Sequence, residues 1–513
     1  MEKIRQHPIF ILLIINIAIG LFTFRGYGLS WDEPLFYDYA NALGYAYSPN
    51  EWFSGDFNLE NAFGSSATDH ANRGPAYIIL AQPIESLLES LGLDLASAWH
   101  LLNFLTFQLG VYLLYRLAIK WMSRYAALAA ATLFAWQPLL WGHAFINPKD
   151  PPFLVFFIGS MFFGFELIDK LVQNPRPKFT NIFIAAFFLG IATSIRVLGP
   201  LAGILVGIYA LSQIKKITVP ILIKYFSAYV VVTILVAFIT WPYLWTNPLQ
   251  KFIEVFGFMS ANPTQLNVLF NGQIYRADEL PRRYLPILLG YTLTEPVWIL
   301  FTTGLLIGFW KSNNQQRLTL ALVLFWLLIP AAYVILRKPP MYDGYRHFLF
   351  ILPPIFIFAG FAFEKLFDII KTRWGSVILV GILLAPAIYS SIRLHPYEYA
   401  YYNSFTSGTG GAFRTYETEY WLTCYREAVL EFNAKAPQGS QLFVRREPYI
   451  AAYYAGSNIT IRDYRTELKD IKSGDFILVN TRSNEDRSGF RDAPTFIEIS
   501  RENAIFCIIK QVP

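Results

Sequence analysis

Charged residues are scarce in this chain of 513 residues: they make up 15% of it, against about 25% in an ordinary soluble domain. Hydrophobic residues account for 54% and aromatic residues for 17%. This composition excludes a typical soluble protein and indicates one embedded in a membrane bilayer. The net charge of +6 comes without a Lys/Arg-rich run or a nucleic-acid-binding motif, so we expect no nucleic-acid partner.

Cysteine is almost absent as well. Because only Cys424 and Cys507 occur, neither a metal–thiolate site nor a disulfide framework is plausible. Both cysteines lie in the C-terminal region and could pair if that region is extracytoplasmic, but their spacing says nothing about proximity. A cleavage pattern is also lacking after the apolar N-terminal run, which predicts an uncleaved first span rather than a signal peptide.

Long apolar runs, in contrast, are abundant. A transmembrane helix needs about 20 apolar residues, with a range near 17–25. The stretch 181–214 is too long for one crossing and has lysine or arginine beyond both ends, so we expect two short spans that turn near Arg196. With this division the sequence predicts eleven spans: 8–24, 96–119, 125–145, 151–168, 181–195, 197–213, 225–241, 285–309, 317–336, 347–366 and 375–392.

The distribution of basic residues predicts the orientation. With a cytoplasmic N-terminus, an odd number of spans places the C-terminus outside and most short basic loops inside. Residues 1–393 then form the membrane module, with long outer loops at 25–95 and 242–284. Within the first loop, residues 71–92 predict an amphipathic interfacial helix. Residues 394–513 are polar with short alternating segments, typical of a small extracytoplasmic α/β domain.

The predicted fold class is therefore mainly α: a multi-pass protein of the inner or plasma membrane with about 11 transmembrane helices and a small C-terminal α/β domain. One acidic motif, Trp31-Asp32-Glu33-Pro34, follows the first span closely. Two carboxylates at a bilayer surface are costly to desolvate, which favours a chemical role. The alternative is a polar loop that enters a helix, where Asp interacts favourably with the helix dipole.

Two further polar clusters fall on the same predicted side of the membrane. The proline-rich turn 143–152 carries an imidazole, an amide, a cation and a carboxylate, from His143, Asn147, Lys149 and Asp150. The segment 337–347 carries fixed cations and a histidine, from Arg337, Lys338, Arg346 and His347, together with Tyr342 and Tyr345. Cations at headgroup level suit a phosphate, although snorkelling of single arginines is an alternative interpretation.

The acid pair together with FINPKDPPF, YDGYRHFLF and HPYEYAYYNS resembles the GT-C superfamily of polytopic glycosyltransferases. Within it, the chain looks similar to the bacterial branch of the dolichyl-phosphate-mannose protein mannosyltransferases and to the aminoarabinose transferases of lipid A. The resemblance covers residues 1–403. It implies a donor sugar linked to polyprenyl phosphate and transfer, usually with inversion, on the extracytoplasmic face. It also implies Asp32 as the catalytic base and Glu33 as a companion acid.

These roles agree with the chemistry of the reaction. Phosphate leaves as a stable anion, so the enzyme needs a base for the acceptor hydroxyl and fixed positive charge rather than a general acid. The candidates for binding the donor phosphate are Arg337, Lys338, Arg346, His347, Lys149 and Arg196. The candidates for contacting substrate are Trp31, His143, Asn147, Asp150, Tyr342 and Tyr345. The acceptor (a protein, lipid or glycan) is not identified by these residues.

No cofactor is certain. Some members of the superfamily use a divalent cation, and Asp32 and Asp150 could share one, but their spacing is not diagnostic. Two other classes of function stay open: a transporter or flippase of a lipid-linked or anionic substrate, and a non-catalytic lipid-binding protein. A transporter predicts charges near the bilayer midplane and inverted repeats. Here the charges lie at span ends and in outer loops, which favours the transferase.

Overall fold

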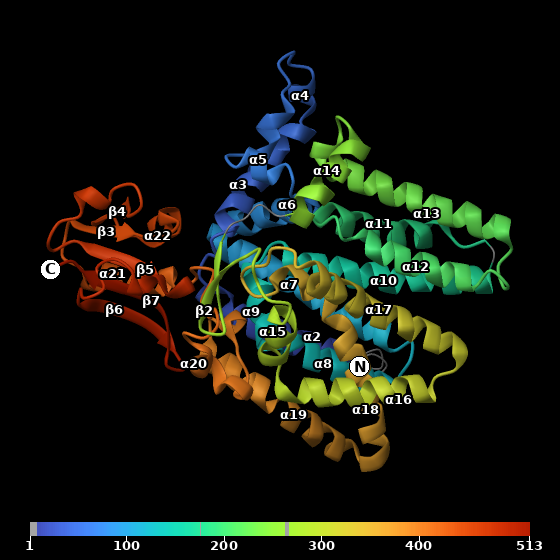
Figure 1. Ribbon diagram of the computed structural model, residues 1–513. Helices are drawn as coiled ribbons and strands as arrows, with labels where there is room; N and C mark the ends of the chain where they lie inside the picture. Colours follow the sequence, from blue (N-terminus) through green and yellow to red (C-terminus); the bar gives the residue numbers. More distant parts are fainter. Residues whose placement is uncertain (1–7, 175, 262–265) are drawn as a thin grey trace.

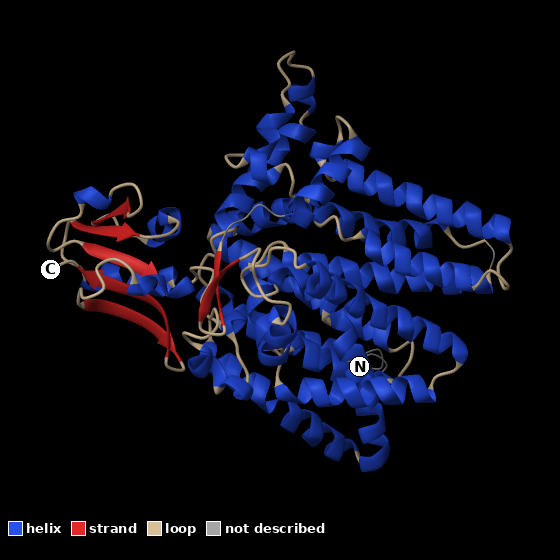
Figure 2. Cartoon of the chain, in the orientation of Figure 1, coloured by secondary structure: helices blue, strands red, loops and turns tan. Residues whose placement is uncertain are grey.

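The structure is a computed structural model that describes residues 8–174, 176–261 and 266–513. It is mainly helical, with a small sheet near the C-terminus (Figure 2). Most of the long helices run side by side, and the sheet lies beyond one end of them (Figure 1). This arrangement agrees with the predicted fold class of a helical membrane module joined to a small α/β region.

Six helices are long and apolar enough to cross a membrane, and the chain is thus a multi-pass membrane protein. A seventh span results if α15 (Tyr284–Thr292) and α16 (Glu295–Lys311), bent by 108° at their break, are counted together. The predicted number of eleven spans stays a prediction. The six are α2 with the turn that follows it (Ile9–Gly26), α7 (Leu95–Ala118), α10 (Asp150–Gln173), α13 (Val219–Ile239), α17 (Asn314–Arg337) and α19 (Arg373–Leu394).

The remaining predicted spans are helical but short or interrupted. The run 125–145 is divided because Pro138 begins a new helix, which gives α8 (Arg124–Ala135) and α9 (Pro138–Ile146). The chain turns at Arg196, as expected, between α11 (Phe179–Ile195) and α12 (Pro200–Ser212). The run 347–366 begins with a 3-10 turn, η5 (Arg346–Ile351), and continues as α18 (Pro353–Ile370). Several of these breaks carry the polar residues of the predicted site.

The two long loops that were predicted to lie on the outer side also contain helices. The first loop forms α3 (Glu33–Leu43), α4 (Pro49–Trp52), α5 (Ala67–His70) and α6 (Ala76–Ser90), with short 3-10 turns between them. The expected amphipathic helix is α6: Tyr77 and Ile78 are buried, whereas Ile84 and Leu87 are exposed apolar residues. The second loop forms α14 (Pro248–Ala261) and a hairpin of β1 (Asn267–Phe270) and β2 (Gln273–Arg276).

The C-terminal sheet has five strands in the order β4-β3-β5-β7-β6. Strand β3 pairs in parallel with β4 and β5, and β7 is antiparallel to β5 and β6. A disulfide joins Cys424, which precedes α21 (Tyr425–Lys435), to Cys507 in β7. The predicted domain boundary at residue 394 stays a prediction. The strands are β3 (Ser440–Val444), β4 (Ile459–Asp463), β5 (Phe476–Asn480), β6 (Thr495–Arg501) and β7 (Ala504–Gln511), and the second helix is α22 (Pro448–Tyr454).

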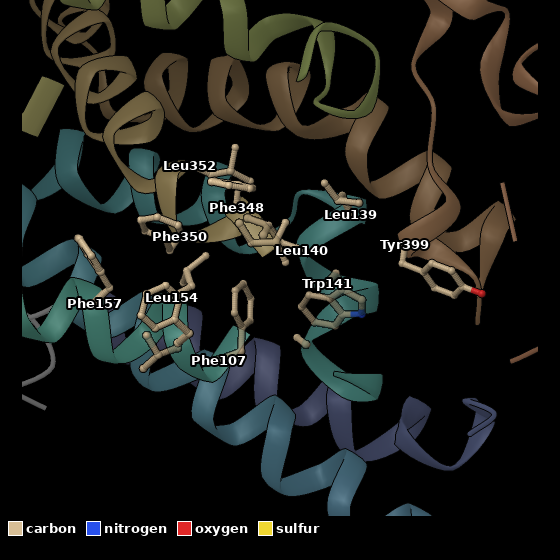
Figure 3. Packing of buried hydrophobic residues seen from close by; sticks show 14 of the residues in the cluster. Phe107, Leu139, Leu140, Trp141, Leu154, Phe157, Phe348, Phe350, Leu352 and Tyr399 are labelled. Carbon is tan, nitrogen blue, oxygen red and sulfur yellow. The ribbon is translucent and has the colours of Figure 1, made fainter. Parts of the chain in front are cut away.

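A packed aromatic and aliphatic core fixes the segment η5. Figure 3 shows side chains of α7, α9, α10 and η5 filling the same interior, among them Phe107, Trp141 and Leu154. The rings of Phe157 and Phe350 lie 5.0 Å apart between centroids, and both side chains are fully or almost fully buried. Close packing of this kind leaves little freedom to the backbone. The polar residues at the start of η5 are therefore held on a rigid support.

Candidate active site

Arg346, the first residue of η5, contacts three carboxylates. Its Nη2 lies 3.3 Å from Asp32 Oδ2, its Nη1 3.2 Å from Asp150 Oδ2, and its Nε 3.2 Å from Asp343 Oδ2. Burial opposes the charge of this guanidinium, but Asp32, Asp343 and Asp150 together raise the pKa of Arg346 above its usual range. The planar fork of an arginine suits such multiple carboxylate contacts. Arg346 thus joins the first long loop, through Asp32, to the start of α10, through Asp150.

Asp150 is fixed by its own turn before it meets the arginines. Asn147 Oδ1 accepts hydrogen bonds from the backbone N–H groups of Lys149 (3.1 Å) and Asp150 (2.9 Å). The Asn147 amide donates to Asp150 Oδ2 at 3.0 Å. The other carboxylate oxygen pairs with Arg196, which follows α11. Asp150 is therefore a buried carboxylate that holds two arginines in place.

Further cations gather beside this pair. Lys149 is buried and its Nζ lies 5.7 Å from the ring centroid of Phe36, in α3. The Arg73 guanidinium lies 5.9 Å from the same centroid and pairs with Asp69 at 2.6 Å. Basic side chains from four separate segments of the chain thus gather in one place, an arrangement that suits a bound phosphate.

Two cavities lie against these residues. The first, which we name the inner cavity, has a volume of about 300 Å³. Its lining combines basic side chains with apolar ones such as Leu201 of α12, Met259 of α14 and Tyr333 of α17. Three arginines, Arg73, Arg196 and Arg346, line it together with Lys149 and His347.

The second, which we name the outer cavity, has a volume of about 360 Å³ and includes Trp31 and Asp32 in its lining. The two cavities adjoin, because they share the lining residues Asp69, Arg73, Phe258, Tyr342 and Arg346. A ligand that spans the junction would have a charged or apolar part in the inner cavity. Its other end would lie beside the carboxylate of Asp32.

The structure brings together most of the residues singled out from the sequence. Those that line one or both cavities are Trp31, Asp32, Lys149, Arg196, Tyr342, Arg346 and His347. Asn147 and Asp150 lie directly behind them as supports. These residues come from segments more than 300 positions apart in the chain, yet they form one cluster.

Glu33 lies elsewhere, although it is adjacent to Asp32 in sequence. Its side chain is fully buried. It accepts hydrogen bonds from Ser30 N–H at 2.7 Å and Tyr37 O–H at 2.6 Å, and lies 3.0 Å from His100 Nε2. Within the described part of the chain it lines neither cavity. Its geometry is that of a structural residue that shapes the loop before α3.

Arg337 and Lys338 also lie outside the cluster. Both side chains are exposed at the end of α17, and neither is among the described residues that line the two cavities. The two prolines that follow, Pro339 and Pro340, separate them from Arg346 and do line the inner cavity. The expectation that all basic residues of the segment 337–347 meet at one phosphate therefore does not match this geometry.

His143 and Tyr345 are buried behind the cluster. His143 Nε2 lies 3.0 Å from the Tyr420 hydroxyl, and Nδ1 lies 3.3 Å from the Asn147 amide. The Tyr345 hydroxyl lies 2.7 Å from Thr292 Oγ1. Both side chains line a small third cavity, which shares Arg346 with the inner and outer cavities. Their predicted contact with substrate stays a prediction.

Sequence reasoning missed several members of the cluster. Asp343 stands inside the YDGYRHF segment and accepts hydrogen bonds from Arg346, Arg482 and Trp421. Arg73, on the first loop, is not part of any of the motifs described above. The one signal for Arg482 is its place just after a continuous apolar strand, β5, where loop residues often carry function. Nothing in the sequence links it to Asp343.

The two carboxylates considered for a shared divalent cation, Asp32 and Asp150, both contact the Arg346 guanidinium. Among the described residues, the one group of side chains with metal-like spacing is Glu419 with Cys424 and Cys507. These two cysteines form the disulfide. The cluster around Arg346 thus combines acidic groups with a fixed organic cation.

No protein-family model matches this chain, and no curated protein matches it. Among solved structures, it is similar to ArnT from Cupriavidus metallidurans in the apo state, with a TM-score of 0.51 and 13% identity over 97% of each chain. It is equally similar to ArnT bound to undecaprenyl phosphate, with a TM-score of 0.51 and 11% identity over 97% of this chain and 98% of that one.

A weaker similarity links it to an archaeal oligosaccharyltransferase from Archaeoglobus fulgidus, with a TM-score of 0.42 and 10% identity over 81% of this chain and 62% of that one. These neighbours are GT-C glycosyltransferases. At such low identities the likeness to ArnT concerns the fold alone. The chain therefore has the fold of the GT-C polytopic glycosyltransferases, as its motifs predicted.

Proposed function

We propose that this protein is a membrane glycosyltransferase that moves a sugar from a polyprenyl-phosphate donor to an acceptor hydroxyl on the extracytoplasmic face. The observation that carries the proposal is the junction of the two cavities at Arg73, Tyr342 and Arg346. An ArnT structure of the same fold has undecaprenyl phosphate bound. A lipid phosphate suits a cavity whose lining combines arginines with apolar side chains.

In this proposal the inner cavity holds the donor. The phosphate lies among Arg73, Lys149, Arg196 and Arg346, and the first prenyl units lie against the apolar walls from α12, α14 and α17. Multiple cations around a phosphate give charge-assisted hydrogen bonds. The sugar then projects past Tyr342 into the outer cavity, where a hydroxyl acceptor can approach it.

Asp32 is the proposed base. The acceptor oxygen attacks the anomeric carbon, the bond from that carbon to the phosphate oxygen breaks, and the hydroxyl proton passes to Asp32. The leaving phosphate keeps the electron pair and is stabilised by the surrounding cations. Because the displacement takes one step, the anomeric configuration is inverted. Arg346 keeps Asp32 beside the phosphate site, since it contacts the carboxylate at 3.3 Å.

The proposed location is the inner or plasma membrane, with the N-terminus cytoplasmic and the C-terminal domain extracytoplasmic. The disulfide between Cys424 and Cys507 supports this orientation. Disulfides persist in oxidising compartments and are rare in the cytosol. The cluster around Arg346 then lies on the side where lipid-linked sugars are presented to outer acceptors.

The test is transfer of sugar from a polyprenyl-phosphate donor by the purified protein, together with mass spectrometry of the lipid that copurifies with it. We expect a bound polyprenyl phosphate and donor-dependent transfer that is lost in Asp32→Asn. Lipid movement across vesicles without any transfer would instead favour the transporter or flippase.

A further inference from the structure

The loop that carries Asp32 is held by the C-terminal domain. The Trp31 backbone N–H donates to the Trp421 carbonyl at 3.2 Å. The Tyr449 hydroxyl, from α22, donates to the Trp31 carbonyl at 2.8 Å. The Leu29 N–H donates to the Tyr454 hydroxyl at 2.9 Å. The backbone just before the proposed base is therefore fixed by residues about 400 positions away.

Arg482 adds a fourth contact to this loop. It begins the turn η9 (Arg482–Arg487) directly after Thr481 and β5, and only 1% of the residue is exposed. Its guanidinium lies 4.6 Å from the ring centroid of Trp31. Its Nη1 donates to the Tyr420 carbonyl at 3.0 Å and to Asp343. A cation of this kind over a tryptophan ring is attractive, more so when it is desolvated.

The placement of Arg482 is costly for the fold. Its Nε and Nη2 atoms form no hydrogen bond with any residue that the structure describes. A buried charge with unsatisfied donors is destabilising unless other groups compensate it. In addition, the next two residues, Ser483 and Asn484, have positive φ angles of 50° and 59°. Strained, buried elements of this kind are often kept for function.

Asp343 connects Arg482 to the site. One carboxylate oxygen accepts from Arg482, and the other accepts from Arg346 Nε at 3.2 Å and Trp421 Nε1 at 3.1 Å. Arg346 in turn contacts Asp32. A continuous path of charge-assisted contacts thus runs from the C-terminal domain to the proposed base. Arg482, which begins this path, also packs on Trp31, the residue next to that base.

We propose that Arg482 is a positioning residue for the transfer reaction, and that the C-terminal domain completes the active site by fixing the loop of Asp32. This inference rests on the proposed function. Arg482 does not line either cavity in the described part of the chain, so it acts through Asp343 and Trp31 rather than on the substrate. Its loss should affect the chemical step more than donor binding.

The first test compares Arg482→Met and Arg482→Lys with Arg462→Met. We expect kcat of Arg482→Met to fall about 100-fold, as a misplaced catalytic group can do, with KM for the donor within about threefold. Arg482→Lys, which keeps the charge, should recover part of the loss. Arg462 is the matched control, because it pairs with Glu467 and Asp470 in the same domain and contacts no residue of the site. A wild-type kcat in Arg482→Met would overturn the proposal.

A milder pair of variants covers the case in which Arg482→Met does not fold. Tyr449→Phe removes the hydrogen bond to the Trp31 carbonyl. Tyr453→Phe, on the same helix, removes a contact with Asp94 instead. Both hydroxyl-bearing side chains are partly exposed, so neither change disturbs the core. We expect kcat to fall about fivefold in Tyr449→Phe alone, the scale of one hydrogen bond. Equal kcat values in the two variants would count against the proposal that the C-terminal domain fixes the loop of Asp32.

A third readout does not depend on sugar transfer. Because both native cysteines are in the disulfide, Asp32→Cys introduces a single free thiol. We expect this thiol to react with a small methanethiosulfonate reagent at least about fivefold faster when Arg482→Met is added, because the loop then opens more often. Arg462→Met should leave the rate unchanged. An unchanged rate with Arg482→Met would overturn the positioning role. Absent transfer by the wild type would overturn only the proposed function.

Discussion

Asp32 and Glu33 are consecutive carboxylates in quite different surroundings. The Asp32 side chain is 18% exposed, lines the outer cavity and contacts Arg346. Glu33 is fully buried, accepts hydrogen bonds from Ser30 and Tyr37, and lies 3.0 Å from His100 Nε2. The first precedes α3 and the second begins it, so the helix start turns the two side chains in different directions.

This difference separates a group that can react from a group that maintains the loop. A base must reach its substrate, and only Asp32 lies on a cavity. A buried carboxylate with satisfied hydrogen bonds stabilises the structure around it, and its loss leaves those donors unpaired. The role of companion acid predicted for Glu33 therefore has little support from geometry, and the two residues should fail in different ways.

The largest effect is expected for Asp32→Asn. The amide cannot accept the acceptor proton, so kcat should fall about 10³-fold, within the range for loss of a general base. The thermal unfolding temperature in detergent should stay within a few degrees, because the side chain is small and partly exposed. Transfer within tenfold of the wild type would remove Asp32 from the role of base and erase the contrast with Glu33.

Glu33→Gln is expected to lower stability rather than activity. The amide presents a donor to the N–H and O–H groups that now donate to the carboxylate, so about 2 kcal/mol of stability should be lost. Chemical or thermal unfolding in detergent measures this. The folded fraction should keep kcat within about threefold. A loss of activity as large as that of Asp32→Asn, without destabilisation, would make Glu33 a participant in the reaction.

Arg73→Met tests whether the cavities beside Asp32 bind the donor phosphate. Arg73 lines both of them, and its partner Asp69 is 42% exposed, so the change leaves no deeply buried charge unpaired. We expect the affinity for undecaprenyl phosphate to fall about tenfold, the loss of one charge-assisted contact. Lys251→Met, at an exposed pair with Glu254, is the control. Unchanged affinity in Arg73→Met would remove this arginine from the phosphate site.

The smallest effect is expected for Arg337→Gln and Lys338→Gln. Both positions are exposed at the end of α17 and lie on neither side of the comparison. Affinity for undecaprenyl phosphate should change less than twofold, since exposed charges are screened by solvent and salt. A tenfold loss in either variant would restore the original prediction that the whole basic segment binds the phosphate.

The sequence predicted the helical module well because its signals are local. Apolar runs such as the one in α7 determine where long helices form, and the proline at position 138 determines where a run breaks. The number of membrane crossings cannot be read from local sequence alone. Short helices such as α11 and α12 depend on their neighbours for burial, and length alone does not assign them to the bilayer. The helix α6 and the strands of the C-terminal sheet formed in the segments where they were predicted.

The site was only partly predictable for a related reason. Motifs showed that Asp32, Asp150 and Arg346 carry unusual chemistry for a membrane surface, but a motif does not show which way each side chain turns. Glu33 and Lys338 do not line the two cavities that the structure describes, whereas Arg73 lines both. Arg482 lies about 140 positions from the carboxylate that it contacts, and no local pattern predicts such a pair.

What the sequence determined by itself is the class of molecule: a membrane protein with carboxylates and cations at the ends of its apolar helices, resembling a superfamily of glycosyltransferases. The membrane class follows from composition and periodicity, which act over a few residues, and the superfamily is what the resemblance of short motifs implies. The tertiary structure decided which carboxylate meets a cavity, which cations surround it, and that the C-terminal domain holds its loop. Such choices depend on packing between distant segments, because a side chain's partners are set by the whole fold rather than by its neighbours in the chain.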